Sequence, residues 1–139
     1  MYAFTVKYAG SFEDAVARTT SELQKEGFGV LTSIDVRATM KRKLGVDGRP
    51  YLILGACNPP FAHRALQAEP DIGILMPCNV VVREEADGSV AVVFTDVRGL
   101  FTLVGRPEVA PLAEQVHERL SAVARAVGAA GTDASCGST

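Results

Sequence analysis

Two largely apolar segments constrain the fold more than any other feature of this sequence. Residues Tyr51 to Ala56 and Ile72 to Val82 have the composition of strands, yet neither alternates between apolar and polar side chains. A strand with one face in water shows such alternation, so these two strands must place apolar side chains on both faces of a sheet. Either helices cover both faces, or a second subunit covers the face that the helices leave open.

The rest of the pattern places helices between strands. A turn at Ala86-Asp87-Gly88 predicts a hairpin between the last two strands, and Pro77 predicts an edge or a bulge in the fourth strand. The order βαβαβαββα predicts an α/β (α+β) fold, a two-layer α/β sandwich with a single mixed sheet and helices mainly on one face. The predicted strands are 2–8, 28–34, 51–56, 71–82 and 89–95, and the predicted helices are 12–26, 36–44, 59–68 and 108–127, with an irregular apolar stretch over 96–105.

Cap residues predict where three of these helices begin. Ser11, Asp35 and Asn58 each precede a helical pattern, and Pro59 stands at a first helical position, where a missing N–H costs nothing. Glycines at the far ends of the first two helices are natural left-handed stops.

Bulk properties indicate one globular domain. The chain has 139 residues, 47% of them hydrophobic and 22% charged, so we expect a domain over 1–127 that folds without metal, cofactor or disulfide, followed by a flexible tail over 128–139. The net charge of −2 argues against a nucleic-acid partner. No apolar run reaches the length of a membrane span, and no signal peptide is apparent. The three cysteines therefore predict reduced thiols in a cytoplasmic protein.

The apolar strands also bear on assembly. Only two of the predicted helices are long, so a homodimer is the more economical way to cover the open face of the sheet. A monomer with helices divided between both faces is the alternative.

Two Cys-Asn pairs beside prolines are the candidate site. Cys57 and Asn58 end the third predicted strand, while Cys78 and Asn79 lie in the fourth. If a crossover helix joins these strands in parallel, the two cysteines lie at similar heights, with His63 as the nearby imidazole. Three interpretations stay open: buried cysteines that only pack, a reactive or soft-metal-binding thiol site, and a binding site formed by asparagine and backbone groups.

A basic segment is the second candidate. Arg37 and Lys41 are four residues apart and share one face of a predicted helix. With the helix start at Asn58 they could form an anion pocket, although a solvated helix face is the plainer interpretation. The sequence contains neither a phosphate-binding glycine loop nor a Gly-x-Ser-x-Gly elbow, so an enzymatic role is uncertain and a non-enzymatic one is favoured.

Six segments in order form a distinctive series: EGFGVLTSIDV at 26–36, TMK at 39–41, KLGV at 43–46, RPYLILGACNPP at 49–60, AHRAL at 62–66 and LMPCNV at 75–80. With these segments the chain resembles the domain of unknown function 302 family, over about residues 1 to 127. The resemblance implies a small, compact bacterial α/β sandwich that forms homodimers, and it implies no activity.

These observations lead to three hypotheses of function. The first is a homodimeric cytoplasmic domain that binds a small molecule or anion in a cleft near Cys57–Pro60 and Cys78–Asn79. The second is a thiol-dependent protein for redox chemistry, sulfur transfer or soft-metal binding through Cys57 and Cys78. The third is a purely structural interaction domain.

Overall fold

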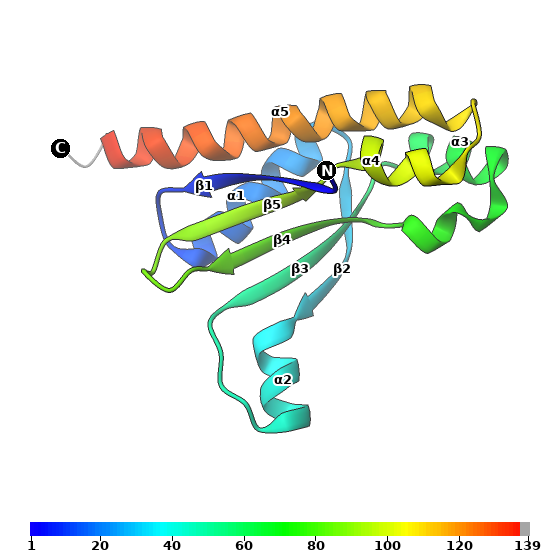
Figure 1. The fold of residues 1–139 in the computed structure, drawn as a ribbon. Coiled ribbons are helices and arrows are strands. Elements are labelled where there is room, and N and C mark those ends of the chain that lie inside the picture. Colours follow the sequence, from blue (N-terminus) through cyan, green and yellow to red (C-terminus); the bar gives the residue numbers. More distant parts are fainter. Residues whose placement is uncertain (137–139) are drawn as a thin grey trace.

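A five-stranded sheet with helices packed on one face forms the body of the protein (Figure 1). The computed structural model describes residues 1–136. The strands lie in the order β1-β5-β4-β3-β2, and each neighbouring pair is antiparallel. The α/β (α+β) sandwich is thus confirmed, whereas the mixed sheet was wrong. The strands are β1 (Ala3–Tyr8), β2 (Gly29–Asp35), β3 (Tyr51–Cys57), β4 (Cys78–Glu84) and β5 (Val90–Thr95).

Seven helical segments connect and cover these strands. Five are α-helices and two are 3-10 turns within residues 1–136. They are α1 (Phe12–Lys25), α2 (Val36–Leu44), α3 (Pro59–Ala68), η1 (Pro70–Leu75), α4 (Val97–Phe101), η2 (Thr102–Val104) and α5 (Val109–Cys136).

The predicted cap residues explain why the first two helices begin where they do. The Ser11 hydroxyl accepts a hydrogen bond from the Asp14 N–H at 3.0 Å, and the Asp35 carboxylate accepts one from the Ala38 N–H at 2.9 Å. Each bond satisfies an N–H that has no partner within its helix. Gly45 ends α2 with a φ of 67°, a left-handed conformation that glycine adopts without strain.

The fourth strand is shorter than predicted. Instead of a strand over 71–82, Pro70–Leu75 forms η1, and β4 begins only at Cys78. Glu69 caps η1 by accepting a hydrogen bond from the Asp71 N–H at 3.1 Å, and Pro70 suits the first helical position. Because Pro77 has no N–H to donate, the ladder starts after it. An apolar run without periodicity does not distinguish a strand from a buried helical turn.

The C-terminal half of the chain holds more helix than predicted. The irregular stretch over 96–105 contains α4 and η2, and α5 continues past the predicted end at Val127 to Cys136. Residues 137–139 of the predicted tail lie outside the described part of the chain, and the division into a domain over 1–127 and a flexible tail stays a prediction.

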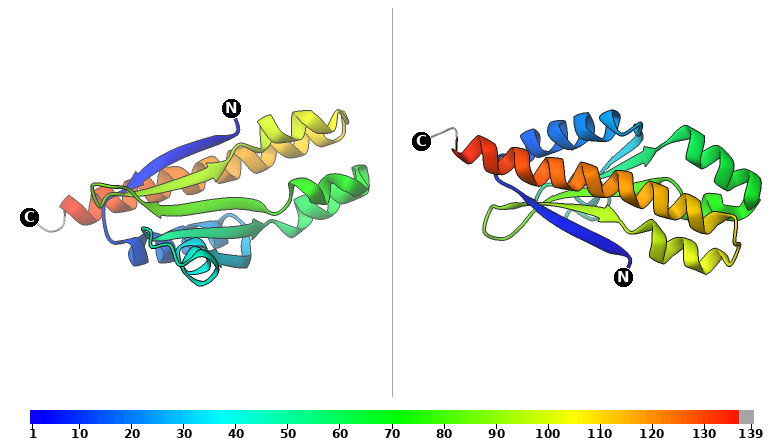
Figure 2. Two further views of the ribbon diagram at one scale, coloured as in Figure 1. Left: turned by 60° about the horizontal axis from the view of Figure 1, so that its bottom comes forward. Right: turned by 90° about the horizontal axis from the view of Figure 1, so that it is seen from above.

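Helices α1 and α5 form the layer that covers the sheet. They contact each other, and Figure 2 shows them side by side on one side of the strands. Leu23 of α1, Phe94 of β5 and Leu120 of α5 are fully buried between the layers. The core therefore lies between the sheet and this helix pair.

A row of apolar side chains crosses the opposite face of the sheet. The register pairs Val93 with Val81, Val81 with Ile53, and Ile53 with Ile34, so these four side chains lie next to one another on four strands. Val81, Val93 and Ile53 are half-buried, and Ile34 is 49% exposed. We call these four residues the open-face row. Apolar side chains thus point to both faces, as the sequence predicted.

Candidate functional site

The two strand cysteines meet at one end of the sheet. Cys57 is the last residue of β3 and Cys78 the first of β4, and the antiparallel register pairs Ala56 with Cys78. The sequence analysis placed the two cysteines at similar heights by assuming that their strands are parallel. That assumption is wrong, because β3 and β4 are antiparallel. They are close because an antiparallel strand begins beside the end of its neighbour.

Both cysteines line a small, partly open cavity, which we call the cysteine-lined cavity. It has room for about 30 Å³, roughly the volume that one water molecule takes in the liquid. Its wall is apolar apart from the sulfur atoms and the amide of Asn58. The lining residues come from β3, α3, β4, α4, α5 and the segments beside them: Phe28, Ala56, Cys57, Asn58, Phe61, Ala62, Ala65, Met76, Pro77, Cys78, Phe101, Leu112 and Val116.

Burial controls the chemistry of one of the two thiols. Removal from water disfavours the thiolate, and a charge on Cys57 would repel it further, so the pKa of Cys78 is raised to about 11. Cys78 therefore carries its proton at neutral pH. Cys57 is half-buried at the same cavity, and neither thiol is in a disulfide.

The side chain of Asn58, which lines the cavity, forms a hydrogen bond to the end of α1. It occupies the N-cap position of α3, yet its side chain makes no cap hydrogen bond. Its Nδ2 instead donates to the Glu26 carbonyl oxygen at 3.2 Å, and Arg119 Nη1 of α5 donates to the same oxygen at 3.3 Å. The amide thus fastens the end of α1 to the start of α3 beside Cys57.

The remaining predicted site residues lie elsewhere. His63 is exposed on α3 and does not line the cavity. Asn79 is exposed on the other face of β4, and its carbonyl oxygen accepts a hydrogen bond from Thr95 Oγ1 at 2.6 Å. Their binding roles stay predictions, but the cysteine-lined cavity includes neither side chain.

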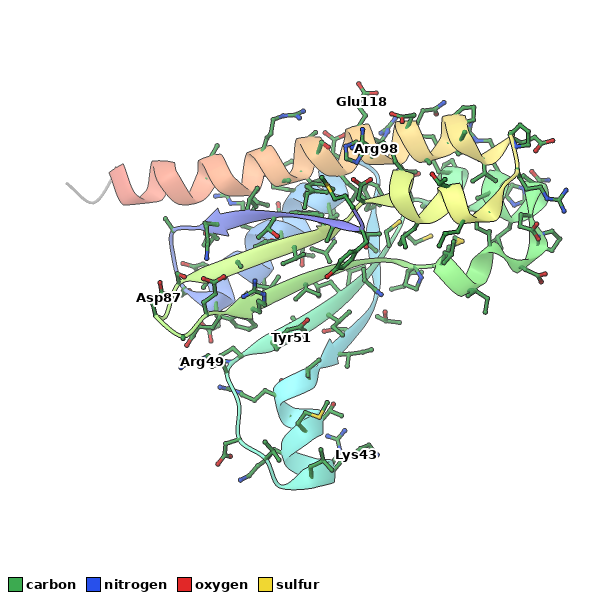
Figure 3. The ribbon with its side chains drawn as sticks, in the orientation of Figure 1. Lys43, Arg49, Tyr51, Asp87, Arg98 and Glu118 are labelled. Atoms are coloured by element: carbon green, nitrogen blue, oxygen red, sulfur yellow. The ribbon has the colours of Figure 1, made fainter. Side chains whose placement is uncertain are left out.

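The basic helix is far from the cysteines. Figure 3 shows Lys43 at the outer end of α2 and Tyr51 at the start of β3, whereas Cys57 ends that strand. The length of β3 therefore separates α2 from the cavity, and no joint anion pocket forms with Asn58. Lys41 pairs with Asp47 at 2.9 Å. Arg37 lines a separate cleft of about 360 Å³ together with the carboxylates of Glu13 and Asp35, which oppose anion binding.

Met76 is the main residue that the sequence analysis missed. It precedes the Pro77-Cys78-Asn79 segment and is one of the residues that line the cavity. Its position two residues before Cys78 was a signal, since the two side chains stay within reach of each other. Phe101 and Leu112 also line the cavity, but only the packing of α4 and α5 brings them there.

A second polar cluster joins α5 to the end of β5. Ser121 Oγ lies 3.2 Å from His117 Nε2, and His117 Nδ1 lies 3.7 Å from Asp96 Oδ1. The order Ser-His-Asp is that of a nucleophilic triad, but 3.7 Å is too long for a hydrogen bond, so His117 Nδ1 has no hydrogen-bond partner. His117 also packs edge-on against Phe4. The cluster holds α5 against β1 and is separate from the cysteine-lined cavity.

Residues 1–136 contain neither a cluster of typical metal ligands nor a helix that could span a membrane. No group of three or more His, Cys, Asp or Glu side chains there could hold a metal ion. No helix in that range combines the length and apolar character needed to cross a bilayer. Any metal at the cavity would thus need a ligand of another type.

One protein family and one solved structure match this chain. The family model for Domain of unknown function DUF302 matches residues 2–127. The chain is similar to the crystal structure of an uncharacterized conserved protein DUF302 from Bacillus stearothermophilus, with a TM-score of 0.85 and 29% sequence identity. That similarity covers 91% of this chain and 98% of the other. No curated protein matches the chain. The matched residues include all five strands and every residue that lines the cysteine-lined cavity.

Proposed function

The chain belongs to the family Domain of unknown function DUF302, and from that premise we propose that it is a homodimeric domain that binds a small ligand in the cysteine-lined cavity. The observation that carries the proposal is the convergence of β3, α3, β4, α4 and α5 on one apolar space that is also lined by two cysteines and one asparagine. Binding sites combine apolar walls with a few placed polar groups in this way.

The size of the cavity limits the ligand. Sites for drug-sized molecules measure about 300–1,000 Å³, whereas this cavity has room for about 30 Å³. The ligand is therefore an ion or a molecule of very few atoms, or a larger molecule that leaves most of its atoms outside.

Native mass spectrometry of the full chain, purified under mild reducing conditions, tests ligand binding. We expect a retained mass on the wild type. Ala62→Phe places a ring in the cavity and should remove that mass, while Leu66→Phe should keep it, because Leu66 is 42% exposed on the same helix and outside the cavity. The proposal would be contradicted if the wild type shows only the mass of the unliganded chain and if Cys57 is alkylated at the same rate in Ala62→Phe and in Leu66→Phe.

The adjacent thiols favour a second candidate, a thiol-dependent protein. Cys57 and Cys78 lie at the same cavity and are free, which suits redox chemistry, sulfur transfer or soft-metal binding. A purely structural interaction domain is the third candidate, and an empty, inert cavity in the experiment above would favour it.

Assembly and location complete the proposal. The open-face row is an apolar strip on the sheet face opposite α1 and α5, and a second copy of the chain would bury it. Free thiols are typical of a reducing compartment, which supports a cytoplasmic protein. The relative from Bacillus supports a bacterial one.

A further inference from the structure

A second cleft lies at the edge of the sheet, between the start of α1 and the start of α2. β2 is an edge strand, and α2 follows directly from its end (Figure 1). We call this space the α1–α2 cleft. It has room for about 360 Å³, within the range of about 300–1,000 Å³ that small-molecule sites occupy, and it shares no residue with the cysteine-lined cavity. The residues that line it are Phe12, Glu13, Val16, Asp35, Arg37, Pro50, Tyr51 and Leu52.

The apolar part of the α1–α2 cleft lies on the face of the sheet that the helices cover. Phe12 and Val16 of α1 and Leu52 of β3 are partly buried and pack against the core. The register pairs Leu52 with Asp35 on one side and with the fully buried Val82 on the other, so these three side chains share one face. The open-face row is on the opposite face, so a dimer formed through that row leaves the cleft on the side away from the partner.

Two opposite charges line the α1–α2 cleft without pairing with each other. Glu13 is three residues before Val16, so the two side chains project from the same side of α1. Arg37 lies in the first turn of α2. Within residues 1–136, neither the Glu13 carboxylate nor the Arg37 guanidinium forms an ion pair or a side-chain hydrogen bond, whereas the Asp35 carboxylate already accepts a hydrogen bond from the Ala38 N–H. The charges of Glu13 and Arg37 are therefore available to a ligand.

The charges of the α1–α2 cleft restrict the class of ligand. Glu13 and Asp35 repel a ligand that is only an anion, and Arg37 repels one that is only a cation. A ligand with both charges is attracted by both kinds of group, because a guanidinium binds a carboxylate through two parallel hydrogen bonds and a carboxylate accepts charge-assisted hydrogen bonds from an ammonium. The apolar wall favours a ligand that also carries an apolar group. An amino acid with an apolar side chain combines these three features.

We propose that the α1–α2 cleft binds a free amino acid with a large apolar side chain. The ammonium group of the ligand pairs with Glu13, and its carboxylate pairs with Arg37. Its side chain lies against the apolar wall formed by Phe12, Val16 and Leu52. This site goes beyond the proposed function, because it is separate from the cysteine-lined cavity and does not depend on a ligand there.

Isothermal titration calorimetry of the full chain tests this site, with L-phenylalanine and L-leucine as probes. Phenylethylamine lacks the carboxylate and phenylpropionate lacks the ammonium, so each should bind about tenfold more weakly than phenylalanine, or weaker still. Glycine lacks the apolar group and should also bind more weakly. The proposal is overturned if neither phenylalanine nor leucine shows saturable binding, or if an analogue with one charge, or glycine, binds as tightly as phenylalanine.

Matched variants assign each charge of the ligand to its partner in the cleft. Glu13→Gln should weaken phenylalanine binding by about tenfold and leave phenylpropionate binding no weaker. Arg37→Gln should weaken phenylalanine binding to a similar extent and leave phenylethylamine binding no weaker. Asp14→Asn and Arg42→Gln are the controls, because they make the same changes of charge at exposed residues of the same two helices, outside the cleft. Unchanged phenylalanine affinity in Glu13→Gln or Arg37→Gln, with native circular dichroism, would overturn the proposal.

A further variant distinguishes this inference from the proposed function. Ala62→Phe fills the cysteine-lined cavity and should leave phenylalanine binding unchanged, because Ala62 does not line the α1–α2 cleft. Loss of phenylalanine binding in a folded Ala62→Phe variant would overturn the inference and assign the amino acid to the cysteine-lined cavity. A chain that binds phenylalanine in the expected way but retains no mass at the cysteine-lined cavity supports the inference and overturns only the proposed function.

Discussion

At the scale of single residues, the buried thiol of Cys78 allows the most direct measurement. Its pKa is about 11, raised first by burial and then by the charge of Cys57. Alkylation of Cys78 followed by mass spectrometry should therefore stay slow at pH 7 and increase up to about pH 11. Cys57→Ala should lower the Cys78 pKa by removing the like charge, yet keep it above the ordinary value because burial remains. Rapid labelling of Cys78 at pH 7 would contradict this account.

Asp96 gives a prediction about stability and pH. Burial opposes its charge, but hydrogen bonds from Arg98 and the Gly99 N–H, with the charges of Arg98 and His117, lower the pKa of its carboxyl overall. A lowered folded-state pKa stabilises the fold above the unfolded-state pKa of about 3.9, and that stability is lost as the pH falls through the folded-state pKa. The stability advantage of wild type over Asp96→Asn should thus be largest near pH 6 and shrink below about pH 4.

Urea unfolding at several pH values between 3 and 6 measures the Asp96 effect. Glu118→Gln is the control, because Glu118 points away from the protein on α5 (Figure 3) and should change stability little at any of these pH values. A difference between wild type and Asp96→Asn that is constant with pH would contradict the assigned role.

At the scale of elements, Gly55 sets how closely β3 approaches its neighbours. A Cβ at Gly55 would lie 2.2 Å from Thr32 Oγ1 and 2.8 Å from Pro77 Cγ. Gly55→Ala should lower the free energy of unfolding by about 1–3 kcal/mol through overpacking. Gly29→Ala is the matched strand control, since its Cβ would meet nothing within 4 Å, and it should stay within about 1 kcal/mol of wild type. Equal stability of both variants in urea unfolding would refute the close approach.

The end of α5 tests the predicted tail. Val123 and Val127 are buried under the sheet, whereas residues 128–139 contain no bulky apolar side chain. A chain that stops after residue 130 should keep its melting temperature within about 2 °C of wild type. A chain that stops after residue 122 loses both valines and should melt at least about 5 °C lower. A large loss in the chain that stops after residue 130 would show that the last nine residues pack.

At the scale of the whole molecule, the open-face row predicts the oligomeric state. Light scattering should give twice the 14.7 kDa of one chain. Ile34→Asp places a charge in the row and should give the mass of a monomer. Ile74→Asp is the control, because Ile74 is 87% exposed on η1, away from the row, and should leave the dimer intact. A monomeric wild type at micromolar concentration would remove the dimer from the proposal.

Local signals in the sequence predicted much of the fold. The caps at Ser11 and Asp35 and the hairpin at Gly88 depend on residues within four positions of each other, so reading the chain in order was enough. The predicted strand over 71–82 failed because Ile72 is buried in η1 just as Val80 and Val82 are buried in β4, and burial alone does not define which of the two elements forms.

The candidate site also combines features that the sequence predicted with features that depend on tertiary structure. The sequence by itself determined that Cys57 ends a strand, because the helix signal at Asn58 and Pro59 follows it directly, whereas it placed Cys78 inside a longer strand. It also determined that apolar side chains point to both faces of the sheet, because the central strands do not alternate. Only the tertiary structure decided that β3 and β4 are antiparallel, that Met76 lines the same cavity as the two cysteines, and that α2 lies away from it. These contacts join residues distant along the chain, and the packing of the helices against the sheet, rather than any local preference, selects them.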